Sequence, residues 1–218
     1  MRTKSQRLSS FIRSILIFAL ILMISQAIYS QSVLTGLGVE IGGGYNQMFL
    51  KDIPRPVMDF RFDRTQFALT PEVRLKYDIR LSDNFNCNPF LGYNRFGGES
   101  SKYSYGGSTI WFDVFEAGLF ITYKVSDFSF GIGYKANRNL KIMDWMSTSP
   151  PIENSSFDVT NQYRSWSHDA GLRVSYRLSH FSISTESWFG ISGLEPNDEL
   201  SQMNIRENHF RLLLGYTL

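Results

Sequence analysis

A strict alternation of apolar and polar residues constrains the fold of this sequence more than any other feature. In the stretch FALTPEVRLKYDIRL, residues 67–81, the odd positions are apolar, aromatic or proline, and every even position from residue 72 is charged. Successive side chains of a β-strand point to opposite faces, so a period of two predicts a strand with one apolar and one charged face. The same plan recurs in WSHDAGLRVSYRL, FSFGIGYK and HFRLLLGYTL. We therefore expect an all-β protein.

The alternating segments add up to eight expected strands. Their ranges are 34–49, 67–81, 85–96, 109–125, 128–138, 165–178, 181–193 and 207–218. Three of the seven connections are short and resemble one another in sequence, and they alternate with four long ones, at 50–66, 97–108, 139–164 and 194–206. Short turns at one end and long loops at the other predict an eight-stranded antiparallel up-and-down transmembrane β-barrel. Two of the short connections, Ser-Asp and Ser-His, lack glycine, so we expect turns slightly longer than the tightest hairpins.

The beginning of the chain predicts a targeting segment. A basic head and an apolar run at 15–24 precede a pair of small residues that ends at Ala27. This order is typical of a secretory signal peptide, and the run is shorter than the roughly 20 residues of a transmembrane helix. We expect a cleaved signal peptide over 1–27 and a barrel domain over 28–218. Cleavage after Ser30 and an uncleaved anchor are the alternatives.

Composition excludes several classes of function. The formal net charge is +2, which does not suggest a nucleic-acid partner, and Cys87 is the only cysteine. A single cysteine provides neither an intramolecular disulfide framework nor a thiolate metal site. The sequence shows no phosphate-binding loop and no metal-ligand motif, so we expect no cofactor and no metal.

Alternation alone does not say which face points outward, because a soluble barrel such as a lipocalin alternates equally well and buries its apolar face. The positions of the aromatic residues favour lipid outside. They gather at both ends of the apolar face, as at two water–lipid interfaces. The expected interfacial aromatics are Tyr77, Tyr123, Phe128, Tyr176, Phe181 and Tyr216 at the short-turn end, and Phe49, Phe67, Trp111, Trp166 and Phe189 at the loop end.

The charged face carries both signs in mixed order. The interior of an eight-stranded barrel is only wide enough for side chains to fill, so we expect a lumen plugged by ion pairs. If the strands on either side of residues 179–180 pair, Arg173 lies opposite Glu186. In the pair formed by strands 109–125 and 128–138, Glu116 lies diagonally near Lys135. The expected lumenal network comprises Glu40, Glu72, Arg74, Lys76, Asp78, Arg80, Glu116, Lys124, Lys135, Asp169, Arg173, Arg177, Glu186 and Arg211. A solvated outer face is the alternative interpretation.

With these features the sequence resembles the family of small eight-stranded outer-membrane β-barrels typified by the OmpA membrane domain and OmpX. The resemblance rests on the signal peptide, the strand count, the asymmetry of turns and loops, the aromatic positions and the final strand FRLLLGYTL. The chain departs from the family in ending on Leu218 instead of an aromatic residue. The resemblance implies a location in the cell outer membrane, in contact with the lipid bilayer and lipopolysaccharide.

Some barrels of this size act on lipid A, and a deacylase needs a serine with a base and an orienting carboxylate. Here His180 lies in a short turn, His168 faces lipid and His209 points inward, so the sequence does not favour an enzyme.

A wide aqueous pore needs about sixteen strands, so the eight expected strands do not favour a porin. The long loops contain Tyr, Trp, Arg and Ser, which suit surface recognition. Our hypothesis is a structural or surface-interaction role with an extracellular or outer-membrane protein partner. An accessory subunit of a larger outer-membrane complex is the alternative, and a lipid A-modifying enzyme is less favoured.

Overall fold

The computed structural model describes residues 36–51, 71–103, 106–148, 152–192, 194 and 204–218. The predicted signal peptide, Phe67 and most of the predicted connections 50–66 and 194–206 lie outside these residues. None of the helices in the described part of the chain is long and apolar enough to cross a membrane.

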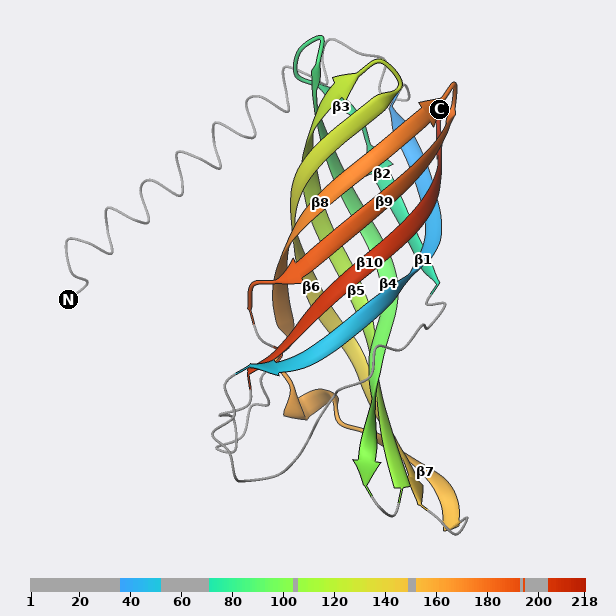
Figure 1. The fold of residues 1–218 in the computed structure, drawn as a ribbon, viewed down its shortest axis with the longest axis vertical. Coiled ribbons are helices and arrows are strands. Elements are labelled where there is room, and N and C mark those ends of the chain that lie inside the picture. Colours follow the sequence, from blue (N-terminus) through green and yellow to red (C-terminus); the bar gives the residue numbers. More distant parts are fainter. Residues whose placement is uncertain (1–35, 52–70, 104–105, 149–151, 193, 195–203) are drawn as a thin grey trace, which may run out of the picture.

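Eight antiparallel strand positions, which we call staves, close into a barrel (Figure 1). In chain order the strands are β1 (Leu37–Lys51), β2 (Glu72–Tyr77) continued by the short β3 (Ile79–Arg80), β4 (Phe85–Tyr103), β5 (Gly106–Val125), β6 (Phe128–Thr148), β8 (Trp166–Leu178), β9 (Phe181–Gly190) and β10 (Asn204–Thr217). Each stave pairs with the next, and β10 pairs with β1 from Gly38 opposite Thr217 to Lys51 opposite Asn204. The predicted all-β, eight-stranded antiparallel barrel is confirmed.

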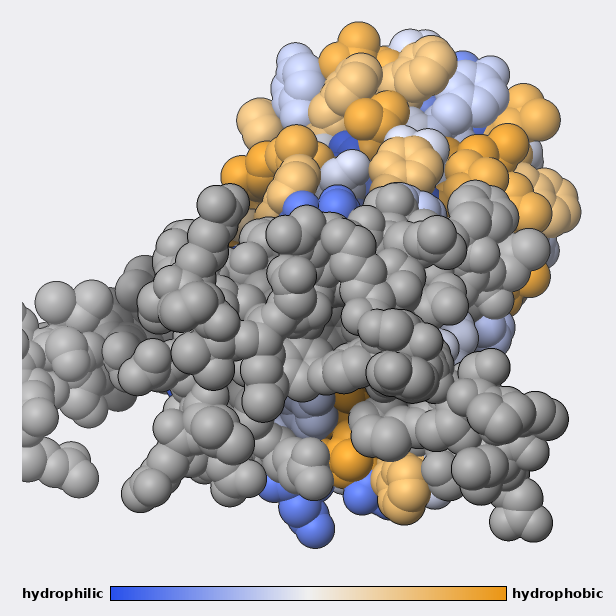
Figure 2. Space-filling model, turned by 60° about the horizontal axis from the view of Figure 1, so that its bottom comes forward, coloured by the Kyte–Doolittle hydropathy of each residue, from blue (hydrophilic) through white to orange (hydrophobic). Residues whose placement is uncertain are grey.

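The apolar face of each strand points outward. On β8, Leu172 and Val174 are 54% and 42% exposed, whereas the intervening Arg173 is buried. The outer surface of the barrel is accordingly rich in apolar side chains (orange in Figure 2), and every stave carries exposed side chains of Leu, Ile, Val or Phe. A soluble barrel would bury this face, so the wall is built to contact lipid.

Two of the short connections are tighter than the sequence predicts. Ser126 and Ser179 each begin a two-residue turn, because Val125 pairs with Phe128 and Leu178 pairs with Phe181. Both serines adopt left-handed backbone angles, with φ of 55° and 58°. Such a conformation costs a non-glycine residue roughly 1–2 kcal/mol. The ladders on either side compensate for this cost, so the expectation of longer turns was wrong.

The predicted loops 97–108 and 139–164 are largely strand. β4, β5 and β6 continue past the barrel wall, and β7 (Ile152–Asp158) pairs with the far part of β6. We call this projection, which comprises 95–103, 106–113, 139–148 and 152–158, the loop-side ribbon (Figure 1). A register shift between Asp113 and Val114 marks the point where the ribbon leaves the barrel, and bulges of this kind bend and twist a strand. Glycine and serine obscure the alternation there, so the sequence did not predict the pairing.

A short 3₁₀ helix, η1 (Thr160–Gln162), follows β7. The hydroxyl and the backbone N–H of Thr160 both donate to Asp158 Oδ1, at 2.6 and 3.0 Å. These hydrogen bonds lower the pKa of Asp158. The turn brings the chain back over the end of the barrel.

An apolar cluster lies where the ribbon meets the barrel. Its members are buried side chains from β4, β5 and β6 together with two residues from the connections: Phe96, Ile110, Phe112, Val114, Ile142, Val159 and Leu194. We call it the apolar cap. It packs against the loop end of the barrel interior through Phe96, whose ring lies 4.9 Å from that of His209. The interior is therefore not charged along its whole length.

Candidate functional site in the barrel interior

The middle of the interior is organised around two arginines from opposite sides of the barrel. Arg173 on β8 donates to Glu186 at 2.8 Å and to Glu40 at 3.1 Å through Nη1. Arg74 on β2 donates to the same two carboxylates, through Nε to Glu40 at 2.7 Å and through Nη1 to Glu186 at 3.0 Å. Two arginines and two glutamates thus form a closed square that ties four staves together. All four side chains are buried.

A second group of ion pairs continues toward the loop end. Arg211 Nη1 on β10 lies 2.9 Å from Glu72 and 3.0 Å from Glu116. Lys135 on β6 lies 3.0 Å from Glu116 and 3.4 Å from Asp169. Lys76 lies 3.3 Å from Glu40. Together with the square, these contacts involve every stave except β4.

Aromatic rings fill the space between the charges. Phe90, Phe120 and Trp188 form a buried cluster. Arg74 lies 4.6 Å from the centre of the Phe90 ring, Lys135 lies 4.9 Å from Trp188, and Arg173 lies 5.5 Å from Phe120. Cations over aromatic faces gain electrostatic attraction as well as packing. The sequence reasoning missed these rings because it assigned aromatic residues to the lipid interfaces.

The predicted network residues divide into three groups. Ten are buried in the interior, namely Glu40, Glu72, Arg74, Lys76, Glu116, Lys135, Asp169, Arg173, Glu186 and Arg211. Asp78 and Arg177 form an ion pair nearer the short-turn end, where the Arg177 side chain is 41% exposed. They line a cavity of about 40 Å³ there.

Two predicted members do not join the buried network. The Arg80 side chain is 60% exposed and pairs with Asp83 in the following turn. Lys124 is exposed, one residue before β5 ends at Val125. Alternation assigned both residues correctly to the charged face of their strands, but at the last positions of a strand that face opens to water. Their assignment to the lumenal network was wrong.

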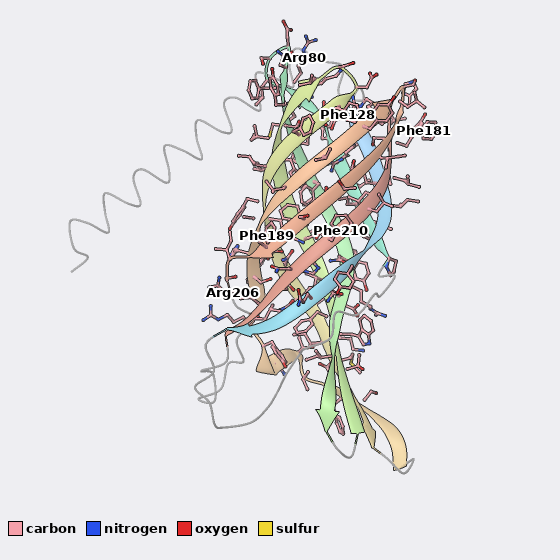
Figure 3. All side chains as sticks on the ribbon, viewed as in Figure 1. Arg80, Phe128, Phe181, Phe189, Arg206 and Phe210 are labelled. Carbon is pink, nitrogen blue, oxygen red and sulfur yellow. The ribbon has the colours of Figure 1, made fainter. Side chains whose placement is uncertain are left out.

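The predicted aromatics mostly lie on the outer wall. At the short-turn end, Tyr123, Phe128, Tyr176, Phe181 and Tyr216 are exposed, and Tyr77 is half-buried. Neighbouring rings there contact one another, as in Phe128–Tyr176 at 4.9 Å and Phe181–Tyr216 at 5.3 Å between ring centres. Trp166 and Phe189 are exposed nearer the loop end, and Trp111 is half-buried in the ribbon. Phe49 belongs to β1 and Phe67 lies outside the described residues. Figure 3 shows Phe128 and Phe181 at one end of the wall and Phe189 and Phe210 toward the other.

One buried cluster was missed as a unit. Glu207 and His209 are two residues apart on β10, so both point inward, and Asp169 points inward from β8. Each of the three offers one ligand atom, and these atoms lie within 4.8 Å of one another. The pattern Glu-x-His on the inward face of the last strand was a usable sequence signal. The third member could not be found without knowing how far the staves are staggered.

The other two histidines lie elsewhere. His168 Nδ1 lies 2.7 Å from the hydroxyl of Tyr134 on the outer wall. His180, in the turn after β8, lies 3.0 Å from the backbone carbonyl of Thr217. Within the described part of the chain, no serine hydroxyl is hydrogen-bonded to a histidine ring.

A closed eight-stranded barrel with an apolar wall and an interior of ion pairs defines an outer-membrane β-barrel protein, and the chain is one.

Neither a protein-family model nor a curated protein matches it by sequence. Among solved structures it is similar to Neisserial surface protein A, with 11% identity, 84% of this chain and 98% of that chain covered, and a TM-score of 0.50. It is also similar to Ail, the attachment invasion locus protein of Yersinia pestis, in complex with the heparin analogue sucrose octasulfate, with 10% identity, 84% and 99% coverage and a TM-score of 0.47. For OprG of Pseudomonas aeruginosa the identity is 12%, the coverage 84% and 96%, and the TM-score 0.39. Likeness at this identity concerns the fold alone.

Proposed function

We propose that this protein is an integral outer-membrane barrel with a plugged polar lumen and a structural or surface-interaction role on its loop side. The observation that carries the proposal is the square of Arg74, Arg173, Glu40 and Glu186 across the middle of the interior. Four buried, mutually paired charges occupy the cross-section that a conducting path would need. Opening such a path would separate charges whose desolvation is offset only by their partners.

Single-channel recording in planar bilayers tests the plugged lumen. We expect the purified protein to give no steady ohmic conductance at neutral pH and moderate salt, with a sixteen-stranded porin in the same membranes as the positive control. A stable conductance in the nanosiemens range, present in every insertion, would contradict the plugged lumen.

We further propose that the outer-wall aromatics lie at the two water–lipid interfaces, with lipopolysaccharide around the loop end. The support is their distribution: exposed Tyr and Phe near the short turns, and Trp166 with Arg138 over its ring, 5.9 Å from the ring centre, near the ribbon. Aromatic rings are favoured at such interfaces. The predicted export signal over 1–27 belongs to the same proposal, and N-terminal sequencing of protein from native membranes tests it.

The loop-side ribbon is the part of the molecule on which an interaction role would rest. Its β7 strand presents Phe157, which is 50% exposed. Met143 on β6 and Asp158 on β7 are paired neighbours, so the segment between them can be replaced by a short turn. Replacing 144–157 by Asn-Gly should shorten the ribbon and leave the barrel intact. We expect cells that display this variant to lose attachment to surfaces or host cells, whereas a Ser156→Ala variant at equal surface abundance keeps it. Unchanged attachment by the shortened variant would leave only the structural role.

An accessory-subunit role is the second candidate, and one observation favours it. On the outward face of the strands, Tyr93 donates to Asp113 at 2.7 Å and Arg95 donates to Asp113 at 2.9 Å. Arg95 and Asp113 line a groove of about 290 Å³ together with Trp111, Lys141 and Met143. The residues that line this groove belong to the loop-side ribbon, beyond the barrel wall, where a protein neighbour can contact their charged and apolar side chains together. Purification from native membranes without crosslinker, with and without Asp113→Ala, would show whether a partner co-elutes through this surface.

We propose no catalytic role. Incubating the purified protein with lipid A and measuring released acyl chains by mass spectrometry tests this part. Turnover above that of a heat-denatured sample would require an enzymatic interpretation.

A further inference from the structure

The buried charges of the interior do not balance. Among the described residues, six buried carboxylates face five buried lysines and arginines: Glu40, Glu72, Glu116, Asp169, Glu186 and Glu207 against Arg74, Lys76, Lys135, Arg173 and Arg211. A buried charge is tolerated only when it is paired. The surplus negative charge lies at Glu207 and Asp169. Glu207 has no lysine or arginine within ion-pair distance in the described part of the chain, and Asp169 shares Lys135 with Glu116.

Asp169, Glu207 and His209, whose ligand atoms lie within 4.8 Å of one another, each carry an unpaired buried atom. Asp169 Oδ1, Glu207 Oε2 and His209 Nε2 are buried atoms without a hydrogen-bond partner among the described residues. The exposed fraction is 0% for Asp169, 1% for Glu207 and 5% for His209. His209 Nε2 lies 3.3 Å from Glu207 Oε2, but the two atoms are not hydrogen-bonded.

The other oxygen of each carboxylate contacts Asn137, and that of Asp169 also lies 3.4 Å from Lys135 Nζ. Asn137 Nδ2 on β6 donates to Asp169 Oδ2 at 2.8 Å and to Glu207 Oε1 at 3.4 Å. One oxygen of each carboxylate is thereby fixed, and the other is left free. The Phe96 ring packs edge-on against the His209 imidazole at 4.9 Å between ring centres. Such outer contacts orient metal ligands.

The sheet also leaves room for the two carboxylates to approach. Asp169 on β8 is opposite Gly190 on β9, and Gly190 is in turn beside Glu207 on β10. A Cβ at Gly190 would lie 3.0 Å from the Glu207 carbonyl oxygen. Because this stave has no side chain at that position, residues two staves apart share one site.

We propose that Asp169, Glu207 and His209 bind one divalent transition-metal ion, with Zn²⁺ the best fit. One imidazole nitrogen and two carboxylate oxygens are a ligand set that zinc accepts. Calcium and magnesium prefer oxygen ligands alone and in larger number. A single proton would also balance the surplus charge. A proton shared between His209 and Glu207, however, leaves Asp169 Oδ1 without a partner, whereas one metal ion satisfies all three atoms.

Elemental analysis tests the proposal on the full barrel without a polyhistidine tag. The protein is refolded in detergent, stripped with a chelator, incubated separately with Zn²⁺, Ca²⁺ or Mg²⁺, and dialysed. We expect one retained zinc per chain and no retained calcium or magnesium. X-ray absorption at the zinc edge should show nitrogen and oxygen ligands at about 2.0–2.2 Å, with the multiple scattering of one imidazole. No retained zinc in the folded wild type, or zinc without an imidazole ligand, would overturn the proposal and favour the shared proton.

Variants locate the site. Glu207→Gln and His209→Gln should each weaken zinc binding at least 100-fold, and Asn137→Ala, which keeps all three ligands, should weaken it about 10–100-fold. The matched control is His168→Gln, because His168 lies near the same end of the barrel on the outer wall. Circular dichroism and the gel mobility of unheated samples identify variants that do not fold. If the folded ligand variants bind zinc as tightly as His168→Gln, the metal lies elsewhere and the assignment is wrong. If both ligand variants fail to fold, Asn137→Ala decides the matter, because unchanged zinc binding in that folded variant would mean that the assignment is wrong.

Discussion

The indole of Trp188 on β9 occupies the space that a side chain on Gly171 of β8 would need. The two residues are register partners, and a Cβ on Gly171 would lie 2.4 Å from Trp188 Cε3. Placed in this way, the indole donates from Nε1 to Glu186 at 2.9 Å and lies under Lys135. A single glycine therefore allows the largest buried side chain of the barrel to connect both groups of ion pairs.

Gly171→Ala should destabilise the barrel by roughly 1–3 kcal/mol, because a tightly packed interior does not absorb an added methyl group. The free energy of unfolding in urea, measured in detergent by tryptophan fluorescence, checks this. Ala170→Ser, on the exposed outer face next door, is the control and should stay within about 0.5 kcal/mol of wild type. Equal stabilities for Gly171→Ala and wild type would mean that Trp188 can move away.

Arg173→Ala should destabilise the barrel by about 3–5 kcal/mol, since it leaves Glu40 and Glu186 short of a buried partner. Arg80→Ala removes only the exposed pair with Asp83, and a surface pair contributes about 0–1 kcal/mol. Comparing the two unfolding midpoints under the same conditions checks the prediction. An Arg173→Ala midpoint as high as that of Arg80→Ala would show that the interior carboxylates find other partners or protons.

A charge on the outer wall should cost most in the middle of the apolar band. Leu172→Arg is expected to destabilise the folded barrel in lipid bilayers by roughly 2–4 kcal/mol, whereas Leu178→Arg, at the end of β8, should cost about 0–1 kcal/mol. Both leucines are exposed on the same strand, so they differ mainly in depth. Reversible unfolding from vesicles gives the comparison. Equal costs would argue that the wall does not cross a bilayer along this line.

Ser126→Gly should stabilise the barrel by about 0.5–1 kcal/mol, because glycine adopts the left-handed conformation of this turn without steric cost. The neighbouring turn residue is not in that region, so Asp127→Gly should be neutral or destabilising. Unfolding in urea again gives the measurement. A loss of stability in Ser126→Gly would indicate that the serine side chain contributes more to the turn than its backbone angle costs.

The local sequence pattern predicted the barrel because the alternation marks two unlike faces on each strand and the aromatic positions indicate which face points outward. Residues joined by a short turn could also be placed opposite each other, as with Arg173 and Glu186. Contacts between distant staves could not be predicted in this way. The bonds from Arg173 to Glu40 depend on how the strands are staggered around the closed sheet, which no local spacing encodes.

Inward positions also need not be polar. The alternation of apolar and charged residues therefore did not predict the inward-facing aromatic side chains. Phe90 and Phe96 point inward on β4, yet the same strand exposes Leu91 and Tyr93 to the outside, so both of its faces look apolar in sequence. Alternation is informative only where the two faces differ in chemistry. The apolar cap and the rings of the interior lie where they do not.

The length of β5 has a consequence for what meets this protein first. Its 20 residues extend about 66 Å at roughly 3.3 Å each, whereas a tilted strand crosses the hydrocarbon in about 9–11 residues. About half of the strand is therefore surplus to the crossing and stands clear of the lipid, held upright by its pairing with β4 and β6. With the loop side outward, as we propose, an approaching cell, phage or antibody would contact the end of this ribbon before it reached the membrane surface.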